Sequence, residues 1–103
     1  IREIIYKIVG KIVQEYHPKK VILFGSYAHG KPTKDSDVDI LLVTERRLHP
    51  GETYEIQRQF LKEFSIPLQL ICVSEEDFTE TKDVICGITY PAAKYGEMLY
   101  AKP

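Results

Sequence analysis

The sequence predicts a single small domain over residues 1–103, of the α/β or α+β class, with a mixed sheet of three to four strands and helices packed mainly on one face. Three observations support this prediction. Two long segments repeat apolar residues at helical spacing, short runs rich in β-branched residues follow each of them, and turn formers lie at the boundaries. A chain of 103 residues, 44% of them hydrophobic, has the size of one domain with one core.

The first expected element is an amphipathic helix that ends at His17-Pro18. The residue before a proline avoids the helical region, so His17 is expected to close the helix. A short buried strand follows at residues 21–24 and ends at Gly25. The apolar residues of the helix recur at steps of three and four: Ile4, Ile5, Ile8, Val9, Ile12, Val13 and Tyr16.

Turn formers dominate residues 26–36, which predicts a short helical turn and then a polar loop. The segment DVDILLV, residues 37–43, follows as the second strand. Because side chains alternate in a strand, Asp37, Asp39 and Leu41 are expected on the same face of the sheet.

A second helix is expected over residues 51–64, where Ile56, Phe60, Leu61 and Phe64 recur at helical spacing. Pro67 separates this helix from the segment LQLICV, which predicts a third buried strand.

The end of the chain predicts two or three further elements. Ser74 followed by Asp77 is a weakened capping box and indicates the start of another helix. Residues 83–94 look helical, with interruptions at a glycine and a proline, and residues 97–101 are expected to add an edge strand.

Composition excludes some classes of protein. The net charge of −1 gives no basic field that favours nucleic acid, and no apolar run approaches the ~18 residues of a membrane span. Cys72 and Cys86 lie in apolar runs, without a Cys/His cluster of zinc-ligand spacing. We interpret both as buried thiols of a cytoplasmic protein rather than as a disulfide. A chain of this size leaves little room for a separate recognition domain, so we expect a partner to help if the substrate is large.

Gly25 and Ser26 form a candidate phosphate-binding turn, because they follow the first strand and open the predicted helical turn. Glycine lets the backbone approach a ligand closely, and the N–H groups at the start of a helical turn point toward a bound anion. Gly-Ser turns that bind nothing are also common, and the pair alone does not distinguish the two.

Asp37 and Asp39 form a candidate metal site. Positions two apart in a strand present their carboxylates to one face, within reach of one or two magnesium ions. Such ions can stabilise both the attacking and the leaving oxygen of a phosphoryl-type displacement. The alternative is a solvated strand end that only ends the pairing, and D-x-D taken alone favours it.

Together, the segments GSYAHG and DVD, in the order strand, turn, loop and strand, resemble the nucleotidyltransferase superfamily related to DNA polymerase β. The resemblance is strongest to its minimal branch, which is written G-S-x-A-R-G followed by D-x-D, and it covers nearly the whole chain. It implies the nucleotidyltransferase fold. The site residues that it implies are Gly25, Ser26 and His29 for the nucleotide, and Asp37 and Asp39 as catalytic residues and metal ligands. Lys34 of the polar loop is a further candidate for the nucleotide, with a solvated loop charge as the alternative.

The resemblance also implies an activity and a partner. Family members transfer a nucleotidyl group, typically AMP from magnesium-bound ATP, to an acceptor hydroxyl. Minimal members are similar to antitoxins that are encoded beside an all-helical HEPN toxin and add AMP to one of its tyrosines. A homo-oligomer through the closing strand is also left open.

The chain departs from this pattern at two positions. Family members place a third carboxylate on the strand after the second helix, and that position here is Gln69. An uncharged amide is a poor general base. Glu76 and Asp77 lie just past this strand as weaker substitutes, and His29 replaces the usual arginine.

Three functions therefore stay open. The first is a magnesium-dependent nucleotidyltransferase that works with a helical partner. The second, motivated by Gln69, is a catalytically impaired relative that binds nucleotide or a partner protein. The third is an interaction module in which the two aspartates are incidental.

Overall fold

The computed structural model describes residues 2–28, 30, 37–81 and 96–102. Within these ranges the elements are, in chain order, α1 (Arg2–Tyr16), β1 (Lys20–Phe24), the short 3-10 helix η1 (Gly25–Tyr27), β2 (Val38–Thr44), α2 (Pro50–Phe64), β3 (Leu68–Ser74), α3 (Glu75–Thr81) and β4 (Glu97–Ala101). The expected helix at residues 83–94 and the expected thiol of Cys86 lie outside the described residues.

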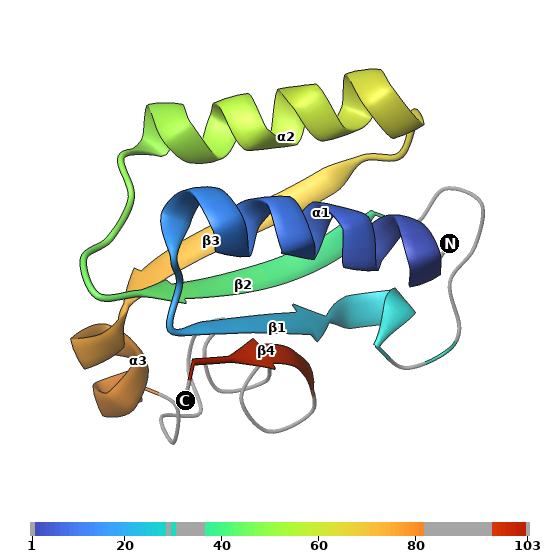
Figure 1. The fold of residues 1–103 in the computed structure, drawn as a ribbon. Helices are drawn as coiled ribbons and strands as arrows, with labels where there is room; N and C mark the ends of the chain where they lie inside the picture. Colours follow the sequence, from blue (N-terminus) through green and yellow to red (C-terminus); the bar gives the residue numbers. More distant parts are fainter. Residues whose placement is uncertain (1, 29, 31–36, 82–95, 103) are drawn as a thin grey trace.

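The four strands form one mixed sheet in the order β3-β2-β1-β4 (Figure 1). β1 pairs antiparallel with both β2 and β4, whereas β2 and β3 run parallel. The parallel pair is connected through α2, as a parallel connection requires. The predicted fold class, a small mixed sheet with helices, is confirmed.

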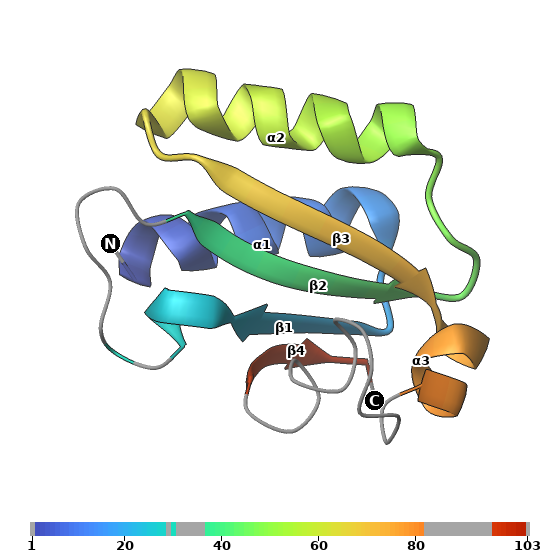
Figure 2. The ribbon, with the colours of Figure 1, turned by 180° about the vertical axis from the view of Figure 1, so that it is seen from behind.

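The two long helices cover one face of the sheet. In Figure 1, α1 lies in front of the strands and α2 runs above β3; in Figure 2, seen from behind, the strands lie in front of α1. The larger core lies between these helices and the sheet. It consists of Ile5, Ile8, Val9, Ile12, Val21, Leu23, Val38, Ile40, Leu42, Ile56, Phe60, Leu68, Leu70 and Cys72.

The opposite face carries a smaller core, which consists of Ile22, Phe24, Leu41, Val43 and Phe78. Phe78 belongs to α3, so this short helix contributes to the face that α1 and α2 leave open. The prediction that helices pack mainly on one face is therefore confirmed for the two long helices, and α3 is the exception.

The element boundaries follow from local chemistry. α1 ends at Tyr16, and His17 takes a left-handed backbone with a φ of 50° while its N–H donates to the Val13 carbonyl at 3.1 Å. The Ser74 hydroxyl accepts from the Asp77 N–H at 3.1 Å, which confirms the predicted start of α3.

The start of α2 carries a cap that the sequence prediction missed. The Nδ1 atom of His49 accepts from the Gly51 N–H at 3.0 Å, and the Glu52 carboxylate accepts from the His49 N–H at 3.1 Å. This arrangement is a reciprocal capping box in which a histidine replaces the usual serine or threonine. His49 thereby fixes the point at which the helix begins.

Cys72 is a buried free thiol, as predicted. Among the described helices, none combines the length and the apolar character that a membrane span requires. The cytoplasmic location stays a prediction.

Candidate functional site

The strand register brings three of the positions singled out in the sequence to one end of the sheet. Asp39 in β2 lies opposite Phe24 at the end of β1, so that Gly25, the next residue, lies beside Asp39. On the other side of β2, Asp39 is paired in register with Gln69 of β3. Neighbouring strands are ~4.8 Å apart, so the three positions form one continuous site.

Gly25 and Asp39 fit together so closely that only glycine is compatible with the arrangement. The φ of Gly25 is +73°, and a Cβ atom built on it would lie 2.2 Å from Oδ2 and 3.1 Å from Cγ of Asp39. Any side chain would therefore collide with the carboxylate and also strain the backbone. We expected a glycine here so that the backbone could approach a ligand; in addition, this glycine makes room for the Asp39 carboxylate.

Asp39 is the one residue of β2 that is not buried. It points to the face opposite α1 and α2, because the neighbouring Val38 and Ile40 both belong to the larger core. Burial first, and then the negative charge of Asp37, raise the pKa of the Asp39 carboxyl above its ordinary value. A cation close to this site would relieve both effects.

Asp37 lies one residue before β2 begins, rather than within it as predicted, and it is exposed. The adjacent Val38 N–H donates to the Pro67 carbonyl at 2.9 Å, which fixes the entry to β2 beside the entry to β3. Asp37 still contributes its negative charge to the surroundings of Asp39.

Gln69 lies where a third carboxylate was expected, directly beside Asp39, and its side chain is exposed. The donors at this end of the sheet are thus two carboxylates and one amide oxygen. No group of three His, Cys, Asp or Glu side chains with metal-binding geometry occurs among the described residues. One or two carboxylates that share the ion with substrate phosphates are nevertheless the usual ligands of magnesium, so the residues present fit this ion.

Glu76 and Asp77 cannot replace the missing carboxylate. They belong to α3, which follows the far end of β3, whereas Gln69 lies near the start of that strand. Along a strand this separation is about 20 Å, at ~3.3 Å per residue. Figure 2 shows α3 and η1 at opposite ends of the sheet.

The remaining predicted nucleotide-binding residues are described only in part. The backbone of Ser26 belongs to η1, next to Gly25. The Ser26 side chain, together with His29 and Lys34, lies outside the described part of the chain.

The chain is similar to known proteins over most of its length. Residues 5–91 match the family described as "Nucleotidyltransferase domain". The chain belongs to this family. Because the match spans α1 to beyond α3, the turn at Gly25, the carboxylates of Asp37 and Asp39, and Gln69 all lie within the nucleotidyltransferase domain.

The nucleotidyltransferase domain also resembles individual proteins. Two candidate protein adenylyltransferases of Methanocaldococcus jannaschii are each 37% identical to it, one over 62 residues and the other over 51. The matches cover 60% and 50% of this chain, and 60% and 51% of the two relatives. The matched part thus spans little more than half the length of these relatives.

Solved structures share the fold. A toxin-antitoxin complex with AMP-PNP superimposes with a TM-score of 0.71 at 20% identity, covering 94% of this chain and 73% of the other. A complex of a tri-AMPylated HEPN toxin with an MNT antitoxin from Shewanella oneidensis gives a TM-score of 0.66 at 17% identity, covering 99% and 74%. At these identities the likeness establishes the fold of the nucleotidyltransferase domain.

Proposed function

We propose that this nucleotidyltransferase domain transfers AMP from magnesium-bound ATP to a hydroxyl group of a partner protein, with a tyrosine of a HEPN-type helical toxin as the acceptor. Pyrophosphate leaves from ATP, and the hydroxyl proton passes to solvent. The observation that carries the proposal is the contact between Gly25 and Asp39, in which a Cβ atom would lie 2.2 Å from the carboxylate. The turn that would bind phosphates and the carboxylate that would bind the metal are thereby one structural unit.

The similar proteins support the nucleotide, the acceptor and the partner. The relatives from Methanocaldococcus jannaschii are candidate protein adenylyltransferases, which supports AMP as the transferred group and a protein as the acceptor. The structures with the same fold include one with AMP-PNP and one in which a HEPN toxin carries AMP groups beside its MNT antitoxin. By analogy, this domain acts as the antitoxin of such a pair.

Each residue of the site has a part in this proposal. Asp37 and Asp39 hold the magnesium ion, which when bound neutralises the phosphate charge of ATP. The backbone of Gly25 and Ser26 lies beside Asp39 and contacts the β and γ phosphates. Gln69 is near enough to orient the acceptor or the nucleotide by hydrogen bonds, but an amide cannot take the proton that the acceptor hydroxyl loses.

Gln69 motivates a second candidate function, that of a catalytically impaired relative which binds ATP and neutralises its partner by contact. A general base typically accelerates a reaction by roughly 10²–10⁴-fold. A domain without it could therefore retain nucleotide binding while losing most of its transfer rate. Both candidate functions predict nucleotide binding, and only the first predicts efficient transfer of AMP.

Two measurements test the proposal. Calorimetry should show magnesium-dependent ATP binding by the parent chain and none by Asp37→Asn/Asp39→Asn. Labelled ATP should then transfer its AMP to a HEPN-type partner. Binding without transfer would favour the impaired relative, and no binding by the parent would leave the interaction module as the remaining function.

A further inference from the structure

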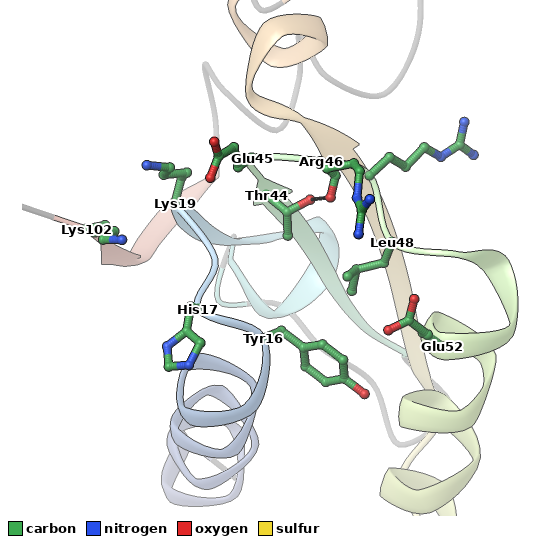
Figure 3. A pocket seen from close by; sticks show the side chains of 10 residues that line it. Tyr16, His17, Lys19, Thr44, Glu45, Arg46, Leu48, Glu52 and Lys102 are labelled. Carbon is green, nitrogen blue, oxygen red and sulfur yellow. Dashed lines mark hydrogen bonds between the residues drawn. The ribbon is translucent and has the colours of Figure 1, made fainter.

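A cavity of about 550 Å³ lies at the end of the sheet opposite Gly25 and Asp39 (Figure 3). It is formed where β1 begins and β2 ends, whereas the candidate transfer site lies where β1 ends and β2 begins. The volume is within the roughly 300–1,000 Å³ that small-molecule sites usually have. Nothing in the proposed transfer reaction uses this end of the domain.

The backbone register gathers positive charge around this cavity. The Lys19 N–H donates to the Val43 carbonyl at 2.7 Å, and the Lys102 N–H donates to the Lys19 carbonyl at 2.8 Å. The ends of β4 and β2 are thereby held on either side of the chain segment that enters β1. The lysine and arginine residues that line the cavity are Lys19, Arg46, Arg47 and Lys102.

These four cations exceed the two carboxylates of the lining, Glu45 and Glu52, although the whole chain has a net charge of −1. Within the described residues, none of the four lies in an ion pair with a carboxylate. Three cations on the outer surfaces of α1 and α2 are paired instead. Unpaired cations around a concave surface attract and hold an anion.

The cavity also has an apolar side. Tyr16 and Leu48 are half-buried and pack against the larger core, and Figure 3 shows both side chains directed toward the cavity. An aromatic ring and an aliphatic side chain offer a surface for the flat, weakly polar part of a ligand, beside the cations that would bind its charged part.

We propose that this cavity binds a phosphate monoester of mononucleotide size, with its phosphate held by cations of the lining and its base on Tyr16 and Leu48. The chain has no net positive charge, and the four cations surround one concave surface, which favours a small anion over a long nucleic acid. The site is distinct from the proposed transfer site, since the length of β1 separates them, about 16 Å at ~3.3 Å per residue.

The test titrates AMP into the isotope-labelled full chain and follows its backbone amides by NMR. The experiment uses the Asp37→Asn/Asp39→Asn variant in the presence of a chelator, so that metal-dependent binding at the candidate transfer site is removed. We expect saturable shifts at Lys19 and at Arg46 to Leu48, weaker binding of inorganic phosphate, and no binding of adenosine. This outcome depends only on the cavity, so it stands or falls independently of the proposed transfer reaction.

A charge-matched pair of variants makes the test specific. Arg46→Gln/Arg47→Gln should raise the Kd for AMP about tenfold or more, because charge-assisted contacts to phosphate are lost. Lys7→Gln/Lys62→Gln removes the same charge from exposed positions of α1 and α2 and should change the Kd less than about twofold. Both arginines are exposed beyond the end of β2, so their replacement should leave the fold intact.

Several results would overturn the proposal. The first is the absence of amide chemical-shift changes at the cavity below about 10 mM AMP. The second is an equal increase in the Kd for AMP in the two double variants. The third is binding of adenosine as strong as that of AMP. Equal binding of inorganic phosphate would refute the assignment of the base to Tyr16 and Leu48. Tighter binding of a single-stranded oligonucleotide than of AMP would replace the small ligand with a nucleic acid.

Discussion

Gly25 and Gly30 offer a matched pair of substitutions that tests how the site is built. Their φ angles are nearly the same, +73° and +72°. A Cβ on Gly25 meets the Asp39 carboxylate at 2.2 Å, whereas a Cβ on Gly30 meets nothing within 4 Å in the described part of the chain. Gly30→Ala therefore measures the backbone strain without a clash against any described residue, and Gly25→Ala measures the strain together with the displacement of Asp39.

The magnitudes follow from these contacts. An alanine in the left-handed region costs about 1 kcal/mol, so Gly30→Ala should lower the free energy of unfolding by about that amount. In Gly25→Ala, the Asp39 oxygen must also retreat by about 1.2 Å to reach an ordinary contact distance of 3.4 Å. Forcing its side chain off a rotamer adds about 1 kcal/mol, for a total of about 2 kcal/mol.

Nucleotide binding should separate the two variants more clearly than stability does. A displacement of about 1 Å in a group that positions substrate can cost up to about 10²-fold in activity. Calorimetry with magnesium-bound ATP should therefore show strongly weakened binding for Gly25→Ala and nearly parental binding for Gly30→Ala. Urea titration of both variants supplies the stability difference.

A double-mutant cycle isolates the contact itself. In an Asp39→Ala background only the Cβ of residue 39 remains, 3.3 Å from the added methyl group, so the extra destabilisation by Gly25→Ala should nearly vanish. If Gly25→Ala and Gly30→Ala have equal effects on both stability and binding, the idea that this glycine makes room for the carboxylate is refuted.

Three further predictions concern the charges and the edge of the sheet. Burial and the charge of Asp37 raise the pKa of Asp39 in the folded chain, so the parent should lose stability relative to Asp39→Asn as the pH rises above the ordinary pKa of 3.8. Urea denaturation of both proteins at several pH values measures this difference. An increase in the parent's stability relative to the variant over the same range would contradict the prediction. Gln69→Asp should restore a base and raise transfer of labelled AMP to the partner about 10²-fold or more, and an unchanged rate would argue against the role assigned to this position. Gln57→Leu removes the acceptor that the Leu70 N–H reaches at 2.7 Å and should cost about 1 kcal/mol in urea titration. The control is the same change at Gln14, an exposed residue of α1, and equal effects would exclude the hydrogen bond as the cause.

Much of the fold could be predicted because local pattern and tertiary structure agree. Ile56 and Phe60 recur at helical spacing, and both lie on the buried side of α2. The alternation in residues 37–43 placed Asp39 and Leu41 on the same face, and Leu41 belongs to the smaller core on that face. Where one periodicity dominates a segment, the buried side of the element follows from it.

Features that depend on pairing between distant segments could not be predicted. The fit of Gly25 against Asp39 requires the antiparallel register of β1 and β2, and no local pattern contains that register. Glu76 follows Gln69 closely in sequence, yet a strand between them carries it to the other end of the sheet. The cap by His49 was missed because histidine is uncommon at that position, although Glu52 three residues later was the available signal.

The burial of β2 determines which side of the site can adapt to a ligand. β2 is hydrogen-bonded to a neighbour on each edge, and every residue of it except Asp39 is buried. Its amide hydrogens should therefore exchange with solvent only when the whole domain unfolds. The position of the Asp39 carboxylate is therefore set by a strand that cannot move, and any adjustment to bulkier or modified nucleotides must come from the backbone on the Gly25 side. Substitutions designed to change the preferred nucleotide should be made on that side rather than in β2.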